Sequence, residues 1–217
     1  LAAEGRDFLT GRLGLNPVPY SPPNNTRVKP PVPHDGTRGY ILSRSLEIHG
    51  RPVAFVFAGN TFAPDGLPLQ LSVPVLKKSL NYQLVANGEA YPLYYDTLFA
   101  ELRNALTVAA MQARKAKGKT GFWAQDKTQV GLKVTTQLEL ENNGVIFPKL
   151  FRRLTDFLAT PNNGGISKFS AWLKAKEEQV LDLDTNNFTH FDNLVLVQNG
   201  KVKLTRLPER IVFVSQK

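Results

Sequence analysis

The chain has 217 residues, contains no cysteine, and carries 27 Lys and Arg against 18 Asp and Glu, a formal net charge of +9. Hydrophobic residues make up 42% of it, enough for a folded core, which excludes disorder along the whole chain. The absence of cysteine excludes disulfides and a cysteine nucleophile, and no apolar run approaches the roughly 20 residues of a membrane-spanning helix. We therefore expect a soluble protein of one large or two small domains whose charge attracts polyanions.

The first predicted elements are a helix over residues 2–13 and a proline-rich extended loop over 16–33. A β-hairpin follows, because residues 40–47 alternate in part between apolar and polar side chains and residues 52–57 are apolar, β-branched and aromatic. His49-Gly50 can form the turn between them.

A loop is predicted over 60–72, and Pro74 then opens a helix that ends at Asn87-Gly88. Asp96 or Thr97 can cap a further helix, whose apolar residues recur at three- and four-residue spacing. That helix ends in a cluster of basic residues: Arg114, Lys115, Lys117 and Lys119. Cations at a helix C-terminus stabilise the helix itself, so part of this cluster has a structural explanation.

Beyond Trp123 the pattern predicts a strand over 129–140 and helices over 150–158 and 166–176. Short strands are expected after these helices, at 180–183, 194–198, 202–205 and 211–214. Asn199-Gly200 has the composition of a tight hairpin turn. The predicted fold class is therefore α+β.

Several segments occur in the same order as motifs of one known family. They are Glu47-Ile48-His49-Gly50-Arg51 with the apolar strand after it, Ser79 to Val85 with Asn81, Ala90 to Tyr95, and the basic helix end with Trp123. Together they resemble the staphylococcal nucleases (the thermonuclease or SNase-like family). The resemblance covers residues 1–126, and residues 127–217 form an α+β extension of unknown role.

The resemblance implies a partial OB-type β-barrel with three helices and a nuclease (hydrolase) activity on phosphodiester bonds of DNA or RNA. Arg51 is then the catalytic residue, because a guanidinium matches phosphate oxygens bidentately and stabilises the charge that develops on them. The same resemblance implies that nucleic acid is bound by five further residues: His49, Tyr94, Tyr95, Arg114 and Lys115. Asn81 is expected to tie a helix to a loop, and Trp123 to fill the core.

One departure concerns the metal. Members of this family cut with Ca²⁺, held by two Asp residues on strands that precede the first helix, where an Arg and a Glu also lie. Here the first helix begins at residue 2, so those ligands have no counterpart, and Asp35-Gly36-Thr37 matches their signature only superficially. Either the chain is an amino-terminally incomplete copy of a catalytic protein, or strands of the extension cover the missing side of the barrel. We expect the chain alone to cleave little or nothing.

Two other functions remain open: a non-catalytic nucleic-acid-binding module, and a protein-interaction domain in which the nuclease surface is vestigial. DNA or RNA is the expected partner, and no metal ligand is predicted, because His34, His49 and His190 are far apart. Many relatives of this fold are exported, so a secreted or cell-envelope location is compatible with the sequence. Oligomeric state and compartment are left open.

Overall fold

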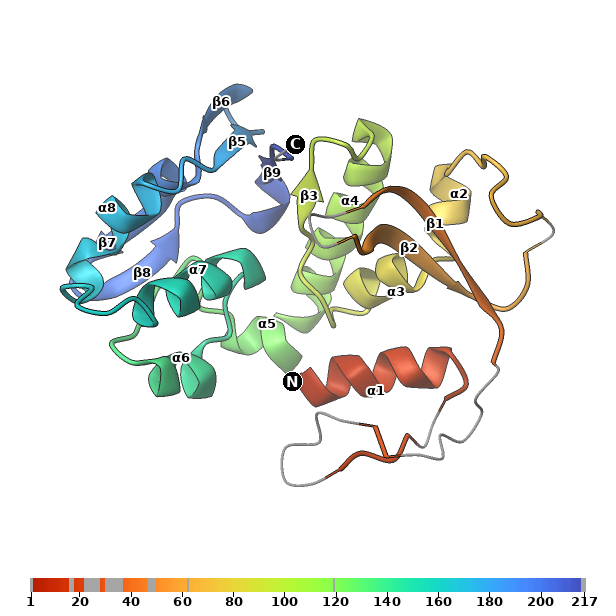
Figure 1. The fold of residues 1–217 in the computed structure, drawn as a ribbon, viewed down its shortest axis with the longest axis horizontal. Coiled ribbons are helices and arrows are strands. Elements are labelled where there is room, and N and C mark those ends of the chain that lie inside the picture. Colours follow the sequence, from red (N-terminus) through yellow and green to blue (C-terminus); the bar gives the residue numbers. More distant parts are fainter. Residues whose placement is uncertain are drawn as a thin grey trace. The chain divides into compact units, whose positions relative to one another are not determined.

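The computed structural model describes residues 2–15, 18–21, 28–29, 37–46, 50–61, 63–118 and 120–215. The chain forms two compact units, Leu1–Ala90 (unit 1) and Tyr91–Lys217 (unit 2), drawn in Figure 1 and taken in turn below.

The described part of unit 1 forms helices and one β-hairpin: α1 (Ala2–Arg12), β1 (Gly39–Leu46), β2 (Pro52–Ala58), α2 (Val73–Leu76) and α3 (Leu80–Ala86). β1 and β2 pair antiparallel, with Tyr40 opposite Phe57, and an irregularity between Ser43 and Ser45 shifts the register. The rings of Tyr40 and Phe57 stack with centroids 4.7 Å apart, and Phe57 is only 1% exposed. The predicted first helix and hairpin are thus confirmed, and α1 packs against α3.

The helix predicted from Pro74 to Gly88 is wrong as a single element, because it divides into α2 and α3. Ser79 causes the division. Its backbone is extended, and its hydroxyl accepts a hydrogen bond from the Tyr82 N–H (3.1 Å) while donating to the carbonyl of Leu76 (2.6 Å). Serine is a strong N-cap residue, so it begins a new helix at Leu80 and also closes the preceding turn.

Unit 2 is the larger unit. Its elements are β3 (Tyr94–Tyr95), α4 (Ala100–Lys117), α5 (Gly121–Gln125), β4 (Leu132–Lys133), α6 (Gln137–Asn143), α7 (Pro148–Leu158), η1 (Ile166–Lys168), α8 (Phe169–Lys174), β5 (Gln179–Asp182), β6 (Asn187–His190), η2 (Phe191–Leu194), β7 (Val195–Gln198), β8 (Lys201–Leu204), η3 (Pro208–Arg210) and β9 (Ile211–Phe213).

The strands of unit 2 form two small sheets, one in the order β3-β9-β5-β6 and one in the order β4-β8-β7. β3 runs parallel to β9, with Tyr94 opposite Val212, and all other pairs are antiparallel. β7 and β8 form the predicted hairpin. Asn199 and Gly200 both have positive φ there (52° and 71°), as its tight turn requires.

The core of unit 2 is built around buried aromatic rings. Phe213 lies 5.1 Å from Phe191 and 6.3 Å from Phe147, measured between ring centroids. Helices α7 and α8 contribute the buried side chains Leu150, Leu154, Phe157, Phe169 and Leu173 to the same core. Several inward-facing side chains of both sheets belong to it too, so one apolar core holds the sheets and these helices together.

The strand predicted over residues 129–140 is wrong for most of its length, because only Leu132 and Lys133 are in a strand and α6 begins at Gln137. Thr136 caps that helix: its hydroxyl accepts from the Glu139 N–H at 3.2 Å. The Glu139 carboxylate in turn accepts from the N–H of Thr135 at 2.8 Å. Thr136-x-x-Glu139 is the sequence signature of a capping box, and it outweighs the β-propensity of the threonines.

The fold class is α+β, and none of the sheets formed by the described residues closes into a barrel. The compact units divide at residue 90, whereas the sequence suggested a domain boundary at residue 126. The segment 91–126 belongs to unit 2 because it bonds to the end of the chain. β3 pairs with β9, and the carboxylate of Asp96 accepts from the N–H and the hydroxyl of Ser215.

Candidate functional site

Arg51, the predicted catalytic residue, lies in unit 1 directly before β2. It follows Gly50, whose φ of +78° bends the chain in a way that a residue with a side chain rarely adopts. The Arg51 side chain is exposed, and β2 holds its position from the next residue onward, where Pro52 is paired with Leu46. The preceding His49, predicted to contact substrate, lies outside the described residues, as do His34, Asp35 and Gly36.

Asn81 fixes the strand that follows Arg51. Its amide oxygen accepts from the Val56 N–H at 2.8 Å, and its amide nitrogen donates to the carbonyl of Ala54 at 3.2 Å. The predicted structural role of Asn81 is thus confirmed in kind, although its partner is a strand rather than a loop. The side chain offers a donor and an acceptor in the spacing that a neighbouring strand would present, so it satisfies the edge of β2 opposite β1.

Tyr94 lies in the core of unit 2, which corrects its predicted place in a nucleotide pocket. The residue is 1% exposed, and its hydroxyl is 2.9 Å from the hydroxyl of Thr107 on α4. Burial raises the pKa of Tyr94 to about 12. No face of this ring is accessible to a base, because alternate side chains of β3 point to opposite sides and that of Tyr94 points inward.

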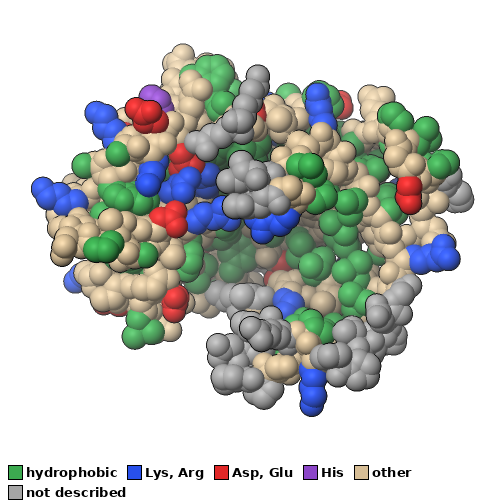
Figure 2. Space-filling view, viewed as in Figure 1, with side chains coloured by type: hydrophobic (Ala, Val, Ile, Leu, Met, Phe, Trp, Pro, Cys, Tyr) green, Lys and Arg blue, Asp and Glu red, His purple; other side chains and the backbone are tan. Residues whose placement is uncertain are grey.

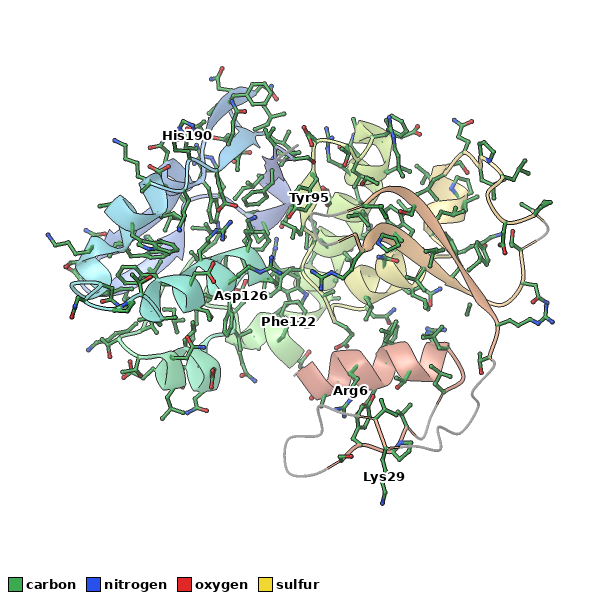
Figure 3. The ribbon with its side chains drawn as sticks, viewed as in Figure 1. Arg6, Lys29, Tyr95, Phe122, Asp126 and His190 are labelled. Atoms are coloured by element: carbon green, nitrogen blue, oxygen red, sulfur yellow. The ribbon has the colours of Figure 1, made fainter. Side chains whose placement is uncertain are left out.

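Tyr95, the next residue along β3, is only half-buried, and Figure 3 labels its side chain. Its ring lies 6.2 Å from that of Phe213 at an interplanar angle of 49°. One part of the ring therefore packs on the core while another part stays accessible. Of the two predicted tyrosines, the structure leaves Tyr95 as the candidate for stacking on a base.

Arg114 is engaged inside unit 2. Its two terminal nitrogens donate to both carboxylate oxygens of Glu209, a residue that is fully buried, and the Nη2–Oε2 distance is 2.9 Å. The guanidinium also lies over the ring of Trp123, 4.4 Å from its centroid. Both contacts lock this side chain in place, so its predicted role as a phosphate ligand is replaced by a structural one. Lys115, one residue further on, is exposed.

Trp123 is buried, as predicted, within an aromatic group at α5. Its ring centroid is 4.3 Å from that of Phe122 and 5.0 Å from that of Tyr91. The hydroxyl of Tyr91 donates to Asp126 at 2.8 Å, and Figure 3 labels Phe122 and Asp126 beside this group. Burial, and after it the charge of Asp126, raises the pKa of Tyr91 well above its ordinary value, so the phenol stays neutral.

A second buried ion-pair group joins α7 to the segment before β5. Glu178 accepts from Arg153 Nε at 2.6 Å and from Lys149 Nζ at 2.7 Å. Figure 2 shows Lys and Arg side chains of unit 2 near acidic side chains on the face in view. The start of α7 carries three cations: Lys149 and Arg153 form ion pairs with the buried Glu178, and Arg152 is exposed.

No three His, Cys, Asp or Glu residues among the described ranges are grouped as metal ligands would be. In the acidic pair of Asp182 and Asp184, Arg206 binds both carboxylates and Arg210 binds the second. These residues do not fit Ca²⁺, which needs six to eight oxygen ligands that are not already neutralised. Calcium therefore stays a prediction of the family resemblance. Within the same ranges, no helix has the length and apolarity needed to cross a membrane.

The chain matches no protein-family model, no curated protein and no solved structure. The resemblance to staphylococcal nucleases thus remains a prediction from the order of motifs along the sequence.

Proposed function

We propose that this chain acts on DNA or RNA through residues 1–126, which the resemblance assigns to an OB-type, nuclease-like fold, and that hydrolysis of phosphodiester bonds is the reaction in which Arg51 takes part. The observation that carries the proposal is the exposure of Arg51 at a fixed point of the backbone, between the Gly50 bend and the first pair of β2. A guanidinium held at the end of a rigid strand can meet a phosphate with little loss of conformational freedom.

Arg51 binds two phosphate oxygens and neutralises part of the charge that grows on them as the bond to the leaving oxygen breaks. Such a donor raises the rate only if its position is fixed before the substrate arrives. Asn81 supplies that fixation, because it holds the backbone of β2 at Ala54 and Val56, a few residues from Arg51.

The experiment compares the unaltered chain with Arg51→Gln, using a fluorescent single-stranded oligonucleotide and measuring both binding and cleavage. A charge-assisted hydrogen bond contributes about 1.5–3 kcal/mol, so we expect the dissociation constant to rise by roughly 10- to 100-fold. If cleavage occurs, its rate constant should fall by a further factor on the order of 10².

Arg44→Gln is the matched control, since Arg44 is an exposed arginine on β1 of the same hairpin and its loss changes the net charge equally. Equal effects of the two substitutions on binding and cleavage would show that only overall charge matters and would remove Arg51 from the proposed site.

A second candidate function is nucleic-acid binding without cleavage. The net charge of +9 favours it, because an excess of cations attracts a polyanion whether or not the chain cleaves it. This function predicts binding that weakens steeply with salt and no cleavage in the presence of calcium. Cleavage that EDTA abolishes would refute it in favour of the hydrolase.

A further inference from the structure

The outward face of the sheet β4-β8-β7 in unit 2 carries lysines at neighbouring positions. Side chains of β8 alternate: Val202 and Leu204 are buried in the core, and Lys201 and Lys203 point to the other face. On β4, Leu132 is buried and Lys133 is exposed, so Lys133 lies on that same outer face. We call Lys133, Lys201 and Lys203 the lysine face.

Two of these lysines stand directly opposite one another. Lys133 pairs with Lys201 in the antiparallel register of β4 and β8. The Cβ atoms of directly opposite residues in such a pair are about 4.5–5.5 Å apart, and like charges at such positions destabilise the sheet. The fold therefore places two ammonium groups where they repel each other, an arrangement that folding alone does not favour.

No carboxylate in the described ranges relieves this repulsion by forming an ion pair with any of the three lysines. Hydrogen bonds from the hydroxyl and the N–H of Thr135, at 2.7 and 2.8 Å, are the main cause of the lowered pKa of Glu139, and the charge of Lys133 lowers it further without an ion pair between the two. By contrast, Lys149 and Arg153 of the same unit both form ion pairs with Glu178.

Gly131 leaves the backbone beside the lysine face without a side chain. Gly131 precedes β4 with a φ of +92°, and a Cβ atom built on it would lie 3.3 Å from the Cβ of Lys201 and 3.8 Å from that of Lys203. The aliphatic parts of the two lysines thus pack on the glycine backbone. Leu196 and Gln198 of β7, opposite Lys203 and Lys201, are exposed on the same face, where Lys201 is exposed and Lys203 half-buried.

We propose that the lysine face binds the phosphate backbone of a single-stranded nucleic acid, independently of its sequence. The identity of this polyanion rests on the proposed function, whereas the lysine arrangement does not depend on Arg51. Lys201 and Lys203 lie two residues apart on β8, and Lys133 lies opposite Lys201 on β4. Their three positive charges can each meet a phosphate of one strand. Phosphate binding offsets their mutual repulsion and releases counterions.

A membrane surface is the other polyanion that such a face could meet. Binding to membranes by a surface element usually combines cations with a broad apolar face that carries Trp, Phe or Leu and enters the lipid. The outer side chains of β4, β8 and β7 are Lys133, Lys201, Lys203, Leu196 and Gln198. A single leucine and no aromatic ring lie among these five, which favours nucleic acid.

The test uses the full chain and a mixed-sequence, fluorescein-labelled single-stranded DNA, with binding followed by anisotropy at several salt concentrations. The variant replaces all three lysines: Lys133→Gln, Lys201→Gln and Lys203→Gln. We expect its dissociation constant to rise at least about tenfold near 0.1 M salt. The slope of log K against log salt should fall by about 2, since each phosphate contact on a single strand contributes about 0.7.

The matched control removes the same charge from exposed lysines elsewhere: Lys77→Gln, Lys168→Gln and Lys174→Gln. It should bind almost as tightly as the unaltered chain. Equal weakening by the two triple variants would overturn the proposal, because overall charge would then explain binding. So would unchanged affinity of the first variant, a chain that binds no single-stranded DNA, or lysine-dependent binding confined to vesicles that contain phosphatidylserine.

Arg51→Gln separates this inference from the proposed function. Weakening by the lysine variant with no effect of Arg51→Gln supports the lysine face and refutes the site at Arg51. The reverse result refutes the lysine face and leaves the site at Arg51 standing. The first variant must also retain the melting temperature of the unaltered chain or exceed it, because its substitutions remove a repulsion. A lower melting temperature would mean that the lysines serve the fold, against the proposal.

Discussion

Arg114 and Glu209 form a two-pronged ion pair between α4 and η3, in which the carboxylate is entirely buried and the guanidinium also covers Trp123. The pair joins residues 95 positions apart in sequence. This ion pair explains why Arg114, which the sequence predicted to bind nucleic acid, instead holds two elements of unit 2 together.

Replacing Glu209 by Gln should destabilise unit 2 by about 3–5 kcal/mol, because Arg114 would be left partly buried without its counter-charge. Both tryptophans of the chain, Trp123 and Trp172, lie in unit 2, so urea unfolding followed by tryptophan fluorescence measures its stability. The exposed Glu101→Gln is the control, expected to cost no more than about 1 kcal/mol. A loss at Glu209 no larger than at Glu101 would contradict the structural role.

Asn81→Ala should loosen β2, since the N–H of Val56 and the carbonyl of Ala54 would both lose their partner. Leaving such groups unpaired costs about 1–3 kcal/mol. Hydrogen–deuterium exchange of peptides that contain Val56 should become faster in the variant. Asn60→Ala, at an exposed asparagine of the same unit, should leave this exchange unchanged. Equal exchange rates in the unaltered chain and both variants would show that the hydrogen bonds of Asn81 do not hold β2 in place.

The stabilisation that Glu178 provides should disappear in acid. Burial by itself would raise the pKa of Glu178, but the bonds from Arg153 and Lys149 outweigh it and hold the pKa below the ordinary value. A lowered folded-state pKa means that the stabilisation is present above the unfolded value of about 4.3 and is lost as the pH falls through the folded one. The difference in unfolding free energy between the unaltered chain and Glu178→Gln should therefore be constant from neutral pH down to about 5 and shrink below about 4. A difference that is independent of pH over this range would exclude the linkage.

Lys201→Glu should stabilise unit 2 while weakening the binding of single-stranded DNA. The substitution turns a repulsive cross-strand pair with Lys133 into an attractive one, a change of roughly 0.2–1 kcal/mol at such positions. Urea unfolding and anisotropy on the same protein measure the two effects. Lys174→Glu, which changes the charge equally on α8, should leave the stability and the binding of DNA nearly unaltered. If Lys174→Glu weakened binding as much as Lys201→Glu, or Lys201→Glu had no effect on binding, the result would count against the lysine face.

Elements with a strong local signal were predictable from the sequence. The hairpin around Gly50, the turn at Asn199-Gly200 and helix α7 follow from spacing and turn chemistry, and the structure has all three. The strand predicted over 129–140 is wrong because the capping box at Thr136 begins a helix there. That signal was present in the sequence, since a threonine followed three residues later by a glutamate favours a helix start.

The site residues were less predictable, because their roles depend on partners far away in the sequence. Tyr94 and Tyr95 are adjacent, yet pairing with β9 buries one and leaves the other half-exposed. Likewise, Arg114 and Lys115 look alike in sequence, and only the position of Glu209 separates them. The lysine face had a local signal, the alternation of Lys201 and Lys203, but its repulsive pair required the register with β4.

The parallel pairing of β3 with β9 determines when the four-stranded sheet can form during synthesis. Asp96, just after β3, bonds to a residue 119 positions later, so the four-stranded sheet lacks β9, one of its two inner strands, until that much more of the chain has been made. Segments that follow β3 must wait for β9 with apolar side chains uncovered, and chains in that state are prone to aggregate. In unit 1 the described sheet is the hairpin of β1 and β2, which are neighbours in sequence and can pair as soon as both have been made.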